Sequence, residues 1–120
     1  MENSRVAVVG GRQFRDGEYL FYVLDEFNKK YGIAHIISGG ATGADTLGQS
    51  WSRTRQIPYT IFPAQWDKHG RPAGFIRNAL IVDACDVLMA FPTKESVGTL
   101  HTIELAEASD KIVFVLDKYL

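Results

Sequence analysis

Five short apolar runs separated by stretches of helical periodicity constrain the fold of this 120-residue chain more than any other feature. The runs lie at residues 6–9, 33–37, 59–62, 87–91 and 112–116. They are nearly continuous rather than alternating, which is typical of strands covered on both faces in a parallel sheet. Strands alternating with helices, joined by right-handed crossovers, predict a doubly wound α/β fold. We expect one domain over residues 1–120 with five parallel strands in the order 3-2-1-4-5 and helices on both faces.

The stretches between the runs repeat apolar residues at helical spacing. In the first stretch, Asp16 is predicted to be the N-cap and Gly32 the stop. In the second, Gly48 is predicted to allow close approach to the sheet, with Trp51 turned inward. The long irregular stretch at residues 63–74 is predicted to be a lid. The third helix is marked by Ile76, Ala79, Leu80 and Asp83, and the fourth is predicted to face inward with Leu100, Ile103 and Ala106.

Composition narrows the class of protein. Hydrophobic residues make up 46% and charged residues 22%, as in soluble globular proteins. Thirteen basic and fourteen acidic side chains leave a net charge of -1, which argues against electrostatic capture of nucleic acid or of a membrane. The single cysteine, Cys85, excludes an internal disulfide and a multi-cysteine metal site. We therefore expect a soluble cytoplasmic protein with no metal site, because the chain has neither an export-signal pattern nor a membrane-spanning apolar stretch.

Unusual residues gather in the loops that follow the predicted strands. In an open parallel sheet the ligand crevice lies beyond the carboxyl ends of the strands, where the strand order reverses. The second of these loops, GGATGAD at residues 39–45, can bring backbone N–H groups and a helix N-terminus to an anion. Taken alone, the same loop is equally well explained as a tight turn that packs a helix on the sheet. Arginines and a second helix that begins at a glycine, Gly98, are predicted at the same edge of the sheet. We therefore favour a phosphate site.

The residues that share the carboxyl edge of the predicted sheet are the candidates for the site. Each of them, taken alone, also has a simpler explanation. Any one arginine can be a solvated surface residue, Asp45 can serve the dipole of its own helix, and Trp66 can anchor its loop. The candidate ligand- or phosphate-binding residues are Gly10, Gly11, Arg12, Gly39, Gly40, Thr42, Gly43, Asp45, Trp66, Arg71, Arg77, Asn78, Gly98 and Thr99.

Four ordered motifs give the chain a family resemblance over nearly its whole length. They are VVGGRQFRD at residues 8–16, GGATGAD at 39–45 with Trp51 beyond it, FPAQW at 62–66 with GRPAG at 70–74, and IRN at 76–78. Together they resemble the YspA-related branch of the SLOG superfamily. The resemblance implies a Rossmann-like domain that binds a nucleotide or a nucleotide-derived ligand such as an ADP-ribose derivative. Relatives include the LOG phosphoribohydrolases, which cleave the N-glycosidic bond of nucleoside monophosphates, and the DNA-processing protein DprA.

The chain departs from the hydrolase pattern in its last loop. LOG hydrolases carry PGGxGT followed by a glutamate three residues after the threonine, whereas this chain has PTKESVGT at residues 92–99 and Thr102 in place of that glutamate. The carboxylate thought to assist glycosidic cleavage is therefore absent from its usual place. We interpret the chain first as a binding module for a phosphorylated small molecule.

Two alternative functions and a homodimer are also compatible with the sequence. A nucleoside-monophosphate N-glycosidase would use Arg77 to hold the phosphate or leaving group, with a carboxylate from Asp45, Asp67 or Glu95. Binding of single-stranded nucleic acid would use Trp66, Lys68, Arg71 and Arg77, against the near-neutral total charge. The resemblance also implies a homodimer that pairs through helices.

Overall fold

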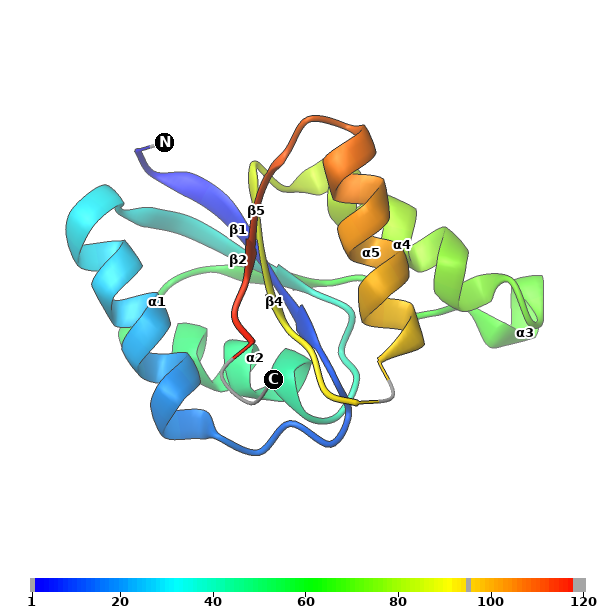
Figure 1. The fold of residues 1–120 in the computed structure, drawn as a ribbon, viewed down its shortest axis with the longest axis horizontal. Coiled ribbons are helices and arrows are strands. Elements are labelled where there is room, and N and C mark those ends of the chain that lie inside the picture. The colour runs from blue at the N-terminus through cyan, green and yellow to red at the C-terminus, as the bar shows by residue number, and fades with distance from the viewer. Residues whose placement is uncertain (1, 95, 118–120) are drawn as a thin grey trace.

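A computed structural model describes residues 2–94 and 96–117 of the chain. Its centre is a five-stranded, all-parallel sheet in the order β3-β2-β1-β4-β5, which confirms the predicted strand order (Figure 1). The chain therefore has the α/β, Rossmann-like fold expected from its alternating pattern. The strands are β1 (Ser4–Gly10), β2 (Ile33–Ser38), β3 (Tyr59–Ile61), β4 (Val87–Phe91) and β5 (Ile112–Val115).

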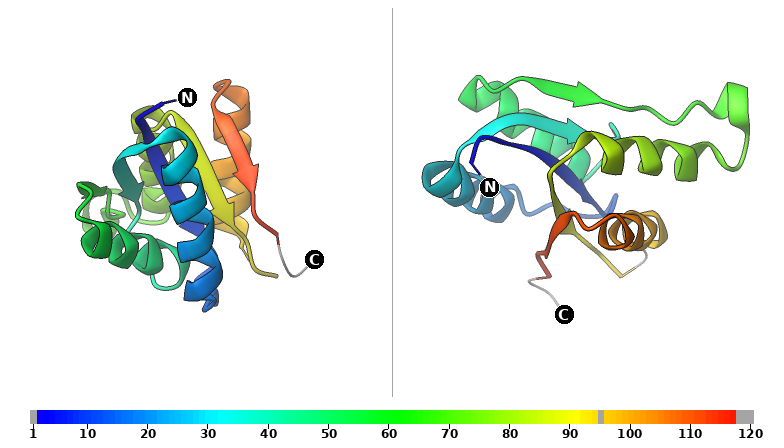
Figure 2. Two further views of the ribbon diagram at one scale, coloured as in Figure 1. Left: turned by 90° about the vertical axis from the view of Figure 1, so that its left-hand side faces the viewer. Right: turned by 90° about the horizontal axis from the view of Figure 1, so that it is seen from above.

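Helices cover both faces of this sheet (Figure 2). On one face lie α1 (Gly17–Tyr31) and α2 (Ala44–Arg55), and on the other lie α4 (Ala73–Ala84) and α5 (Val97–Ala108). In β1, Val6 and Val8 pack into the core under α1 and α2, while Ala7 and Val9 pack under α4 and α5. Because both faces of the central strands β1 and β4 are buried, residues 6–9 of β1 and all residues of β4 are apolar without interruption.

The first helix begins and ends at the predicted residues. The Asp16 side chain accepts a hydrogen bond of 3.1 Å from the backbone N–H of Tyr19, as an N-cap does. Gly32 ends the helix at φ 81°, in the left-handed region that favours glycine. Trp51 of α2 is fully buried, and its indole N–H donates to Asp25 of α1 at 2.9 Å. This bond ties the two helices of that layer together.

Residues 63–74 contain more regular structure than the irregular lid that we predicted. Trp66–His69 form a short helix, α3, and α4 already begins at Ala73. In Figures 1 and 2, α3 lies at the far end of the molecule, beyond the first turn of α4. A four-residue helix is too short to leave a periodic pattern in the sequence, which explains why it was missed.

The residues that mark α4 in the sequence are not the ones that it buries, and the buried face of α5 differs in part from the prediction. Ile76 and Leu80 of α4 are exposed by 39% and 48%, and Leu100 of α5 by 58%. Asn78, Ile81 and Val82 of α4 are buried instead, as are Thr99 and Thr102 of α5 beside the predicted Ile103 and Ala106. Both helices are apolar around most of their circumference, so apolar spacing alone did not identify the buried face.

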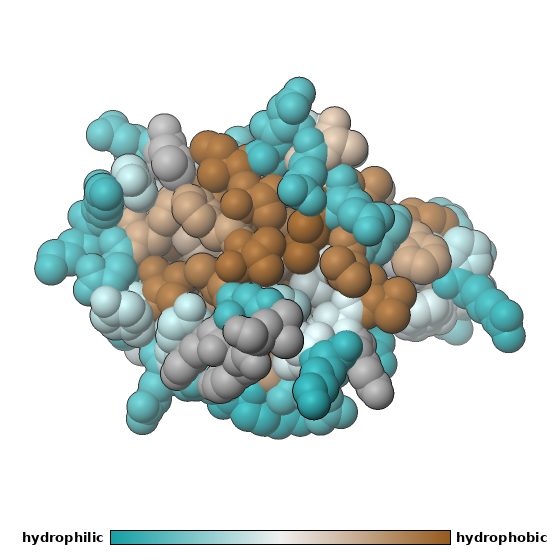
Figure 3. Space-filling view, viewed as in Figure 1, coloured by the Kyte–Doolittle hydropathy of each residue, from teal (hydrophilic) through white to brown (hydrophobic). Residues whose placement is uncertain are grey.

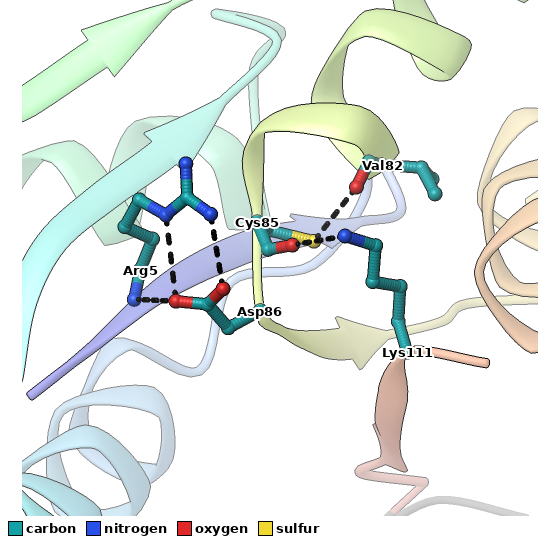
Figure 4. A network of polar contacts seen from close by, with 5 residues as sticks. All are labelled: Arg5, Val82, Cys85, Asp86 and Lys111. Carbon is teal, nitrogen blue, oxygen red and sulfur yellow. Dashed lines mark hydrogen bonds and ion pairs between the residues drawn. The ribbon is translucent and has the colours of Figure 1, made fainter. Parts of the chain in front are cut away.

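A polar network joins the amino ends of the strands, at the edge of the sheet opposite the glycine loops (Figure 4). The guanidinium of Arg5 bonds the carboxylate of Asp86 at 3.0 Å, and the backbone N–H of Arg5 donates to the same carboxylate at 2.9 Å. The ammonium of Lys111 donates to the carbonyl of Cys85 at 2.8 Å. These bonds connect β1, β4 and the start of β5. Across residues 2–94 and 96–117, no helix is both long enough and apolar enough to cross a membrane.

Candidate functional site

The pocket at the carboxyl edge of the sheet lies where the strand order reverses, between β1 and β4. It has a volume of about 390 Å³, and the carboxyl ends of β1 and β4 that border it lie toward the bottom of Figure 1. It is formed by the loop after β1, the first turn of α2, the middle of α4 and the loop that leads into α5. Eight of the predicted residues line it: Gly10, Gly11, Arg12, Asp45, Arg77, Asn78, Gly98 and Thr99.

Of the six predicted residues that do not line the pocket, two lie on or next to the short helix α3. Trp66 and Arg71 are not among the described residues that line the pocket. The Trp66 side chain is 53% exposed and borders a separate shallow groove with Asp67 and Lys68 on α3. Arg71 is an exposed residue in the turn between α3 and α4. Glu95, proposed above as a carboxylate for catalysis, lies outside the described residues.

The backbone of the glycine loop binds the carboxylate of Asp45, the last residue of the same motif. Asp45 accepts hydrogen bonds from the backbone N–H groups of Gly39 at 3.0 Å and Ala41 at 3.4 Å. Amide groups that we predicted for a phosphate therefore bind a side chain of the same loop. Ala41 and Asp45 reach the pocket, whereas Gly39, Gly40, Thr42 and Gly43 do not line it.

Gly43 joins this loop to the one after β1. Its φ of 84° lies in the left-handed region, and a Cβ at this position would collide with the carbonyl oxygen of Gly11. The backbone N–H of Ala44 donates to that same oxygen at 3.4 Å. Close approach of the two loops brings Arg12 and Asp45 to one pocket.

Burial controls the charge of Asp45. Asp45 is only 5% exposed, and this burial raises the pKa of its carboxyl group to about 6. The hydrogen bonds from Ala41 and Gly39 and the positive charge of Arg77 act in the opposite direction. Asp45 therefore exchanges its proton close to neutral pH.

Arg77 is held inside the pocket rather than on the surface. Its Nη1 donates to the carbonyl oxygen of Gly39 at 2.9 Å, and its Nε donates to Oδ1 of Asn78 at 3.1 Å. Burial lowers the pKa of Arg77, the charge of Asp45 raises it, and the like charge of Arg12 lowers it further. Two guanidinium groups that repel one another at one pocket form a place where an anion is stabilised.

The N-terminal end of α5 forms the opposite wall. Gly98 and Thr99 lie in its first turn, as predicted, and Asn78 donates from Nδ2 to the Gly98 carbonyl at 3.3 Å. The hydroxyl of Thr102, at the position where LOG hydrolases carry a glutamate, donates to the same carbonyl at 2.9 Å. Among the described residues, this wall is therefore built from hydroxyls and helix amides rather than from a second carboxylate.

Residues that the sequence reasoning missed also line the pocket. The polar ones among them are Gln13 in the loop after β1 and Thr93, Ser96 and Thr102 at the wall formed by α5, and the hydroxyls of Thr93 and Ser96 lie 2.9 Å apart. Seven polar or charged side chains are buried among the described residues, and four of these belong to the pocket: Asp45, Asn78, Thr99 and Thr102. Thr102 follows Thr99 by three residues, so helical spacing from the predicted Gly98 and Thr99 was the signal that could have identified it.

Comparison with known proteins gives a family and a group of similar folds. The model of the YspA, cpYpsA-related SLOG family matches residues 4–69. The chain is similar to the Gene 61 protein of Mycobacterium phage D29, with 37% identity over 111 residues that cover 86% of this chain and 88% of the phage protein.

Two solved structures of DNA processing protein A (DprA) have a similar fold. The chain superposes on DprA from Streptococcus pneumoniae with a TM-score of 0.75 and 19% identity, covering 94% of this chain and 52% of that one. For DprA from Helicobacter pylori, described for its single-stranded DNA binding mode, the TM-score is 0.73 and the identity 22%, covering 99% and 67%. The chain thus spans about half to two thirds of the length of these proteins.

Proposed function

The chain belongs to the YspA, cpYpsA-related SLOG family, and we propose that its pocket binds a nucleotide or a nucleotide-derived phosphorylated small molecule. One observation carries the proposal: Arg12, Arg77 and the first turn of α5 face the same space as the buried carboxyl of Asp45. A cationic side and a hydrogen-bonding side within one pocket match a ligand that is anionic at one end and hydroxylated at the other.

The cationic side is suited to a phosphate. Arg12 is exposed and its guanidinium is available, while Arg77 is fixed by Gly39 and Asn78. Guanidinium groups bind phosphate oxygens through paired, charge-assisted hydrogen bonds. The first turn of α5 adds backbone N–H groups and the positive end of its dipole. The phosphate site in this proposal is therefore the space between Arg12, Arg77 and Gly98, rather than the amides of the glycine loop.

The hydrogen-bonding side is suited to a sugar. An ionised Asp45 accepts hydrogen bonds from ligand hydroxyls, and the side chains of Thr93 and Ser96 both donate and accept. A volume of about 390 Å³ lies at the lower end of the range for small-molecule sites. That size favours a mononucleotide or a part of a dinucleotide such as the ADP-ribose unit.

A binding experiment with a matched pair of variants tests the proposal. Thermal unfolding and titration calorimetry would be measured with AMP, GMP, CMP, UMP, ADP-ribose, adenosine, ribose 5-phosphate and inorganic phosphate. We expect at least one phosphorylated nucleoside to raise the Tm, because a ligand that binds only the folded state stabilises it. Adenosine should have a smaller effect than AMP.

Arg12→Gln and Arg71→Gln form the matched pair, since both remove one exposed arginine and only Arg12 lines the pocket. Arg12→Gln should weaken binding by about tenfold or more, as expected for one lost charge-assisted hydrogen bond. Arg71→Gln should bind like the wild type. If no compound in the panel raised the Tm, or if the two variants behaved alike, the proposal would be wrong.

Turnover is measured in the same samples. A phosphoribohydrolase would release free base from a nucleoside monophosphate and would need a carboxylate at the reacting carbon. Among the residues that the structure describes, Asp45 places a carboxylate in the pocket, whereas Asp67 lies on α3 outside it. Base release that Asp45→Asn abolishes while binding persists would identify an enzyme. Binding without base release would identify a binding module.

Single-stranded DNA is a second candidate ligand, favoured by the similar fold of the Helicobacter pylori protein with its single-stranded DNA binding mode. In this chain the exposed Trp66 could stack on a base, with Lys68 and Arg71 nearby along the chain. Fluorescence anisotropy with a labelled oligonucleotide at low salt tests this function. Binding that is lost in Trp66→Ala and kept in Arg12→Gln would support it over the nucleotide pocket.

A further inference from the structure

The edge strand β5 leaves apolar surface uncovered. Its sequence is Ile-Val-Phe-Val, and Ile112 and Val115 are exposed by 41% and 48%. Figure 3 shows a hydrophobic band across the face of the molecule that carries α1, β5 and α5 in the orientation of Figure 1. No charged residue interrupts the strand, as one does on many edge strands that stay unpaired.

The outer backbone groups of β5 are directed away from the sheet. Ile112 and Leu116 donate their N–H groups to the carbonyls of Asp86 and Ala90, on the side of β4. Since alternate residues of a strand direct their backbone groups to opposite sides, Val113 and Val115 present N–H and C=O groups on the free side. In the part of the chain that the structure describes, β5 is the last strand on this side of the sheet.

The strand is complementary to itself in one antiparallel register. When Phe114 faces Phe114 of a second copy, Val113 faces Val115, which are the residues with free backbone groups. Such a pair exchanges two hydrogen bonds, and the two-fold symmetry repeats it. Two residues beyond this core on either side, Lys111 of one copy faces Asp117 of the other. The Lys111 ammonium bonds the Cys85 carbonyl and keeps two N–H donors for that carboxylate.

A groove beside the strand accommodates the second copy's side chains. It has a volume of about 660 Å³ and is lined by Val23 and Phe27 of α1, Met89 of β4, and Phe114 and Leu116. Phe114 and Leu116 face this groove and are only partly buried. In the register above, Leu116 of one copy lies opposite Ile112 of the other, so the apolar row of β5 continues across the two chains.

We propose that the homodimer pairs through β5 rather than through helices, with β5 antiparallel to β5 of a second copy about a two-fold axis at Phe114. The two sheets then become one continuous sheet, and both free edges at β5 disappear. The strand directions oppose one another, so each ligand pocket stays within its own chain at opposite sides of the dimer. This inference is independent of the proposed ligand.

Proline substitution at the free edge tests the pairing. Val115→Pro removes an N–H group that β4 does not use, and proline is tolerated on an edge strand at such a position. Its matched control, Val115→Thr, keeps the N–H group and the β-branched shape. Sedimentation equilibrium should show a dimer for the wild type and Val115→Thr, and a folded monomer for Val115→Pro. Circular dichroism checks the fold of each variant.

Crosslinking tests the register and does not depend on the proline variant. Phe114→Cys places one thiol from each copy at the two-fold axis, within the Cα separation that a disulfide spans. Ile112→Cys, on the same face, places its two thiols several residues apart. Mild oxidation should give a covalent dimer with Phe114→Cys and not with Ile112→Cys. The native Cys85 is buried and its thiol pKa is raised to about 11, so it does not compete.

Several results would overturn the dimer and leave the ligand pocket untouched. These are a wild type that remains monomeric at high concentration, equal crosslinking of both cysteine variants, or a dimer that persists in a folded Val115→Pro chain. The last result would place the interface on the exposed apolar side chains of α4 and α5. Nucleotide binding measured on Val115→Pro keeps the two proposals separate, because its pocket should bind as in the wild type.

Discussion

Asp45 shows how one residue can connect a loop to a ligand site. Sequence reasoning placed it at the carboxyl edge but left open a role at the N-terminus of its own helix, a ligand contact and a catalytic role. In the structure its carboxylate binds the amides of Gly39 and Ala41, which precede the helix that carries it. The sequence did not predict this arrangement, because it depends on the positive φ angles of Gly40 and Gly43 that turn the loop back.

Burial of this carboxyl group makes the stability of the free protein depend on pH. The pKa of Asp45 is about 6 in the folded chain and near 4 in the unfolded chain, so the folded state holds this proton more tightly between those values. The contribution of Asp45 to stability therefore decreases as pH rises from about 4 to about 6, and it stays low above that range.

Asp45→Asn should remove this dependence. The variant should be more stable than the wild type at neutral pH, by about 3 kcal/mol at most, and the difference should shrink toward zero near pH 4. Urea unfolding of both proteins across this pH range measures the difference. A constant difference at every pH would contradict a raised pKa for Asp45. The other carboxyl groups contribute equally to the pH dependence of both proteins, so their contribution cancels in the difference.

At the scale of elements, the strands were predictable and two helix faces were not. Each strand of the sheet coincides with an apolar run, and in the central strands β1 and β4 burial on both faces makes that run continuous. The helices α1 and α2 have one apolar side, and their buried residues follow the predicted stripe. For α4 and α5 the apolar residues continue around the helix, so the buried face was set by packing against the sheet and by the pocket.

Two helical glycines provide a prediction at this scale. A Cβ at Gly48 of α2 would lie 2.9 Å from Cβ of Val8, a fully buried residue of β1, whereas a Cβ at Gly98 of α5 would meet nothing within 4 Å. Gly48→Ala should therefore destabilise the protein by about 1–3 kcal/mol through overpacking, despite the better helix propensity of alanine.

Gly98→Ala is the control, and it should stabilise the ligand-free protein by a few tenths of a kcal/mol up to about 1 kcal/mol. Thermal or urea unfolding without ligand separates the two variants. Equal stability changes in the same direction would show that helix propensity, and not the close packing of α2 on β1, controls the outcome. The sequence predicted the close approach at Gly48, and the distance to Val8 confirms it.

At the scale of the whole molecule, the two ends of the sheet differ in chemistry. At the amino ends, Arg5 and Asp86 pair with one another, and Lys111 bonds a backbone carbonyl. At the carboxyl ends, Arg12 and Arg77 face a pocket, and no salt bridge forms at either arginine among the described residues. The sequence could not distinguish these arginines by type, because only the topology assigns each to one end of the strands.

This separation predicts that stability and ligand binding can be changed independently. Asp86→Ala removes the acceptor of the Arg5 guanidinium and backbone N–H, so it should lower the Tm and leave the Kd of the nucleotide unchanged. Arg12→Gln should raise the Kd without lowering the Tm of the free protein, because its exposed guanidinium forms no salt bridge to the described residues and its charge repels that of Arg77. The double variant should show both effects in full, as expected for sites that share no partner. A Kd change in Asp86→Ala, or a double variant that differs from the sum, would mean that the two ends of the sheet are coupled.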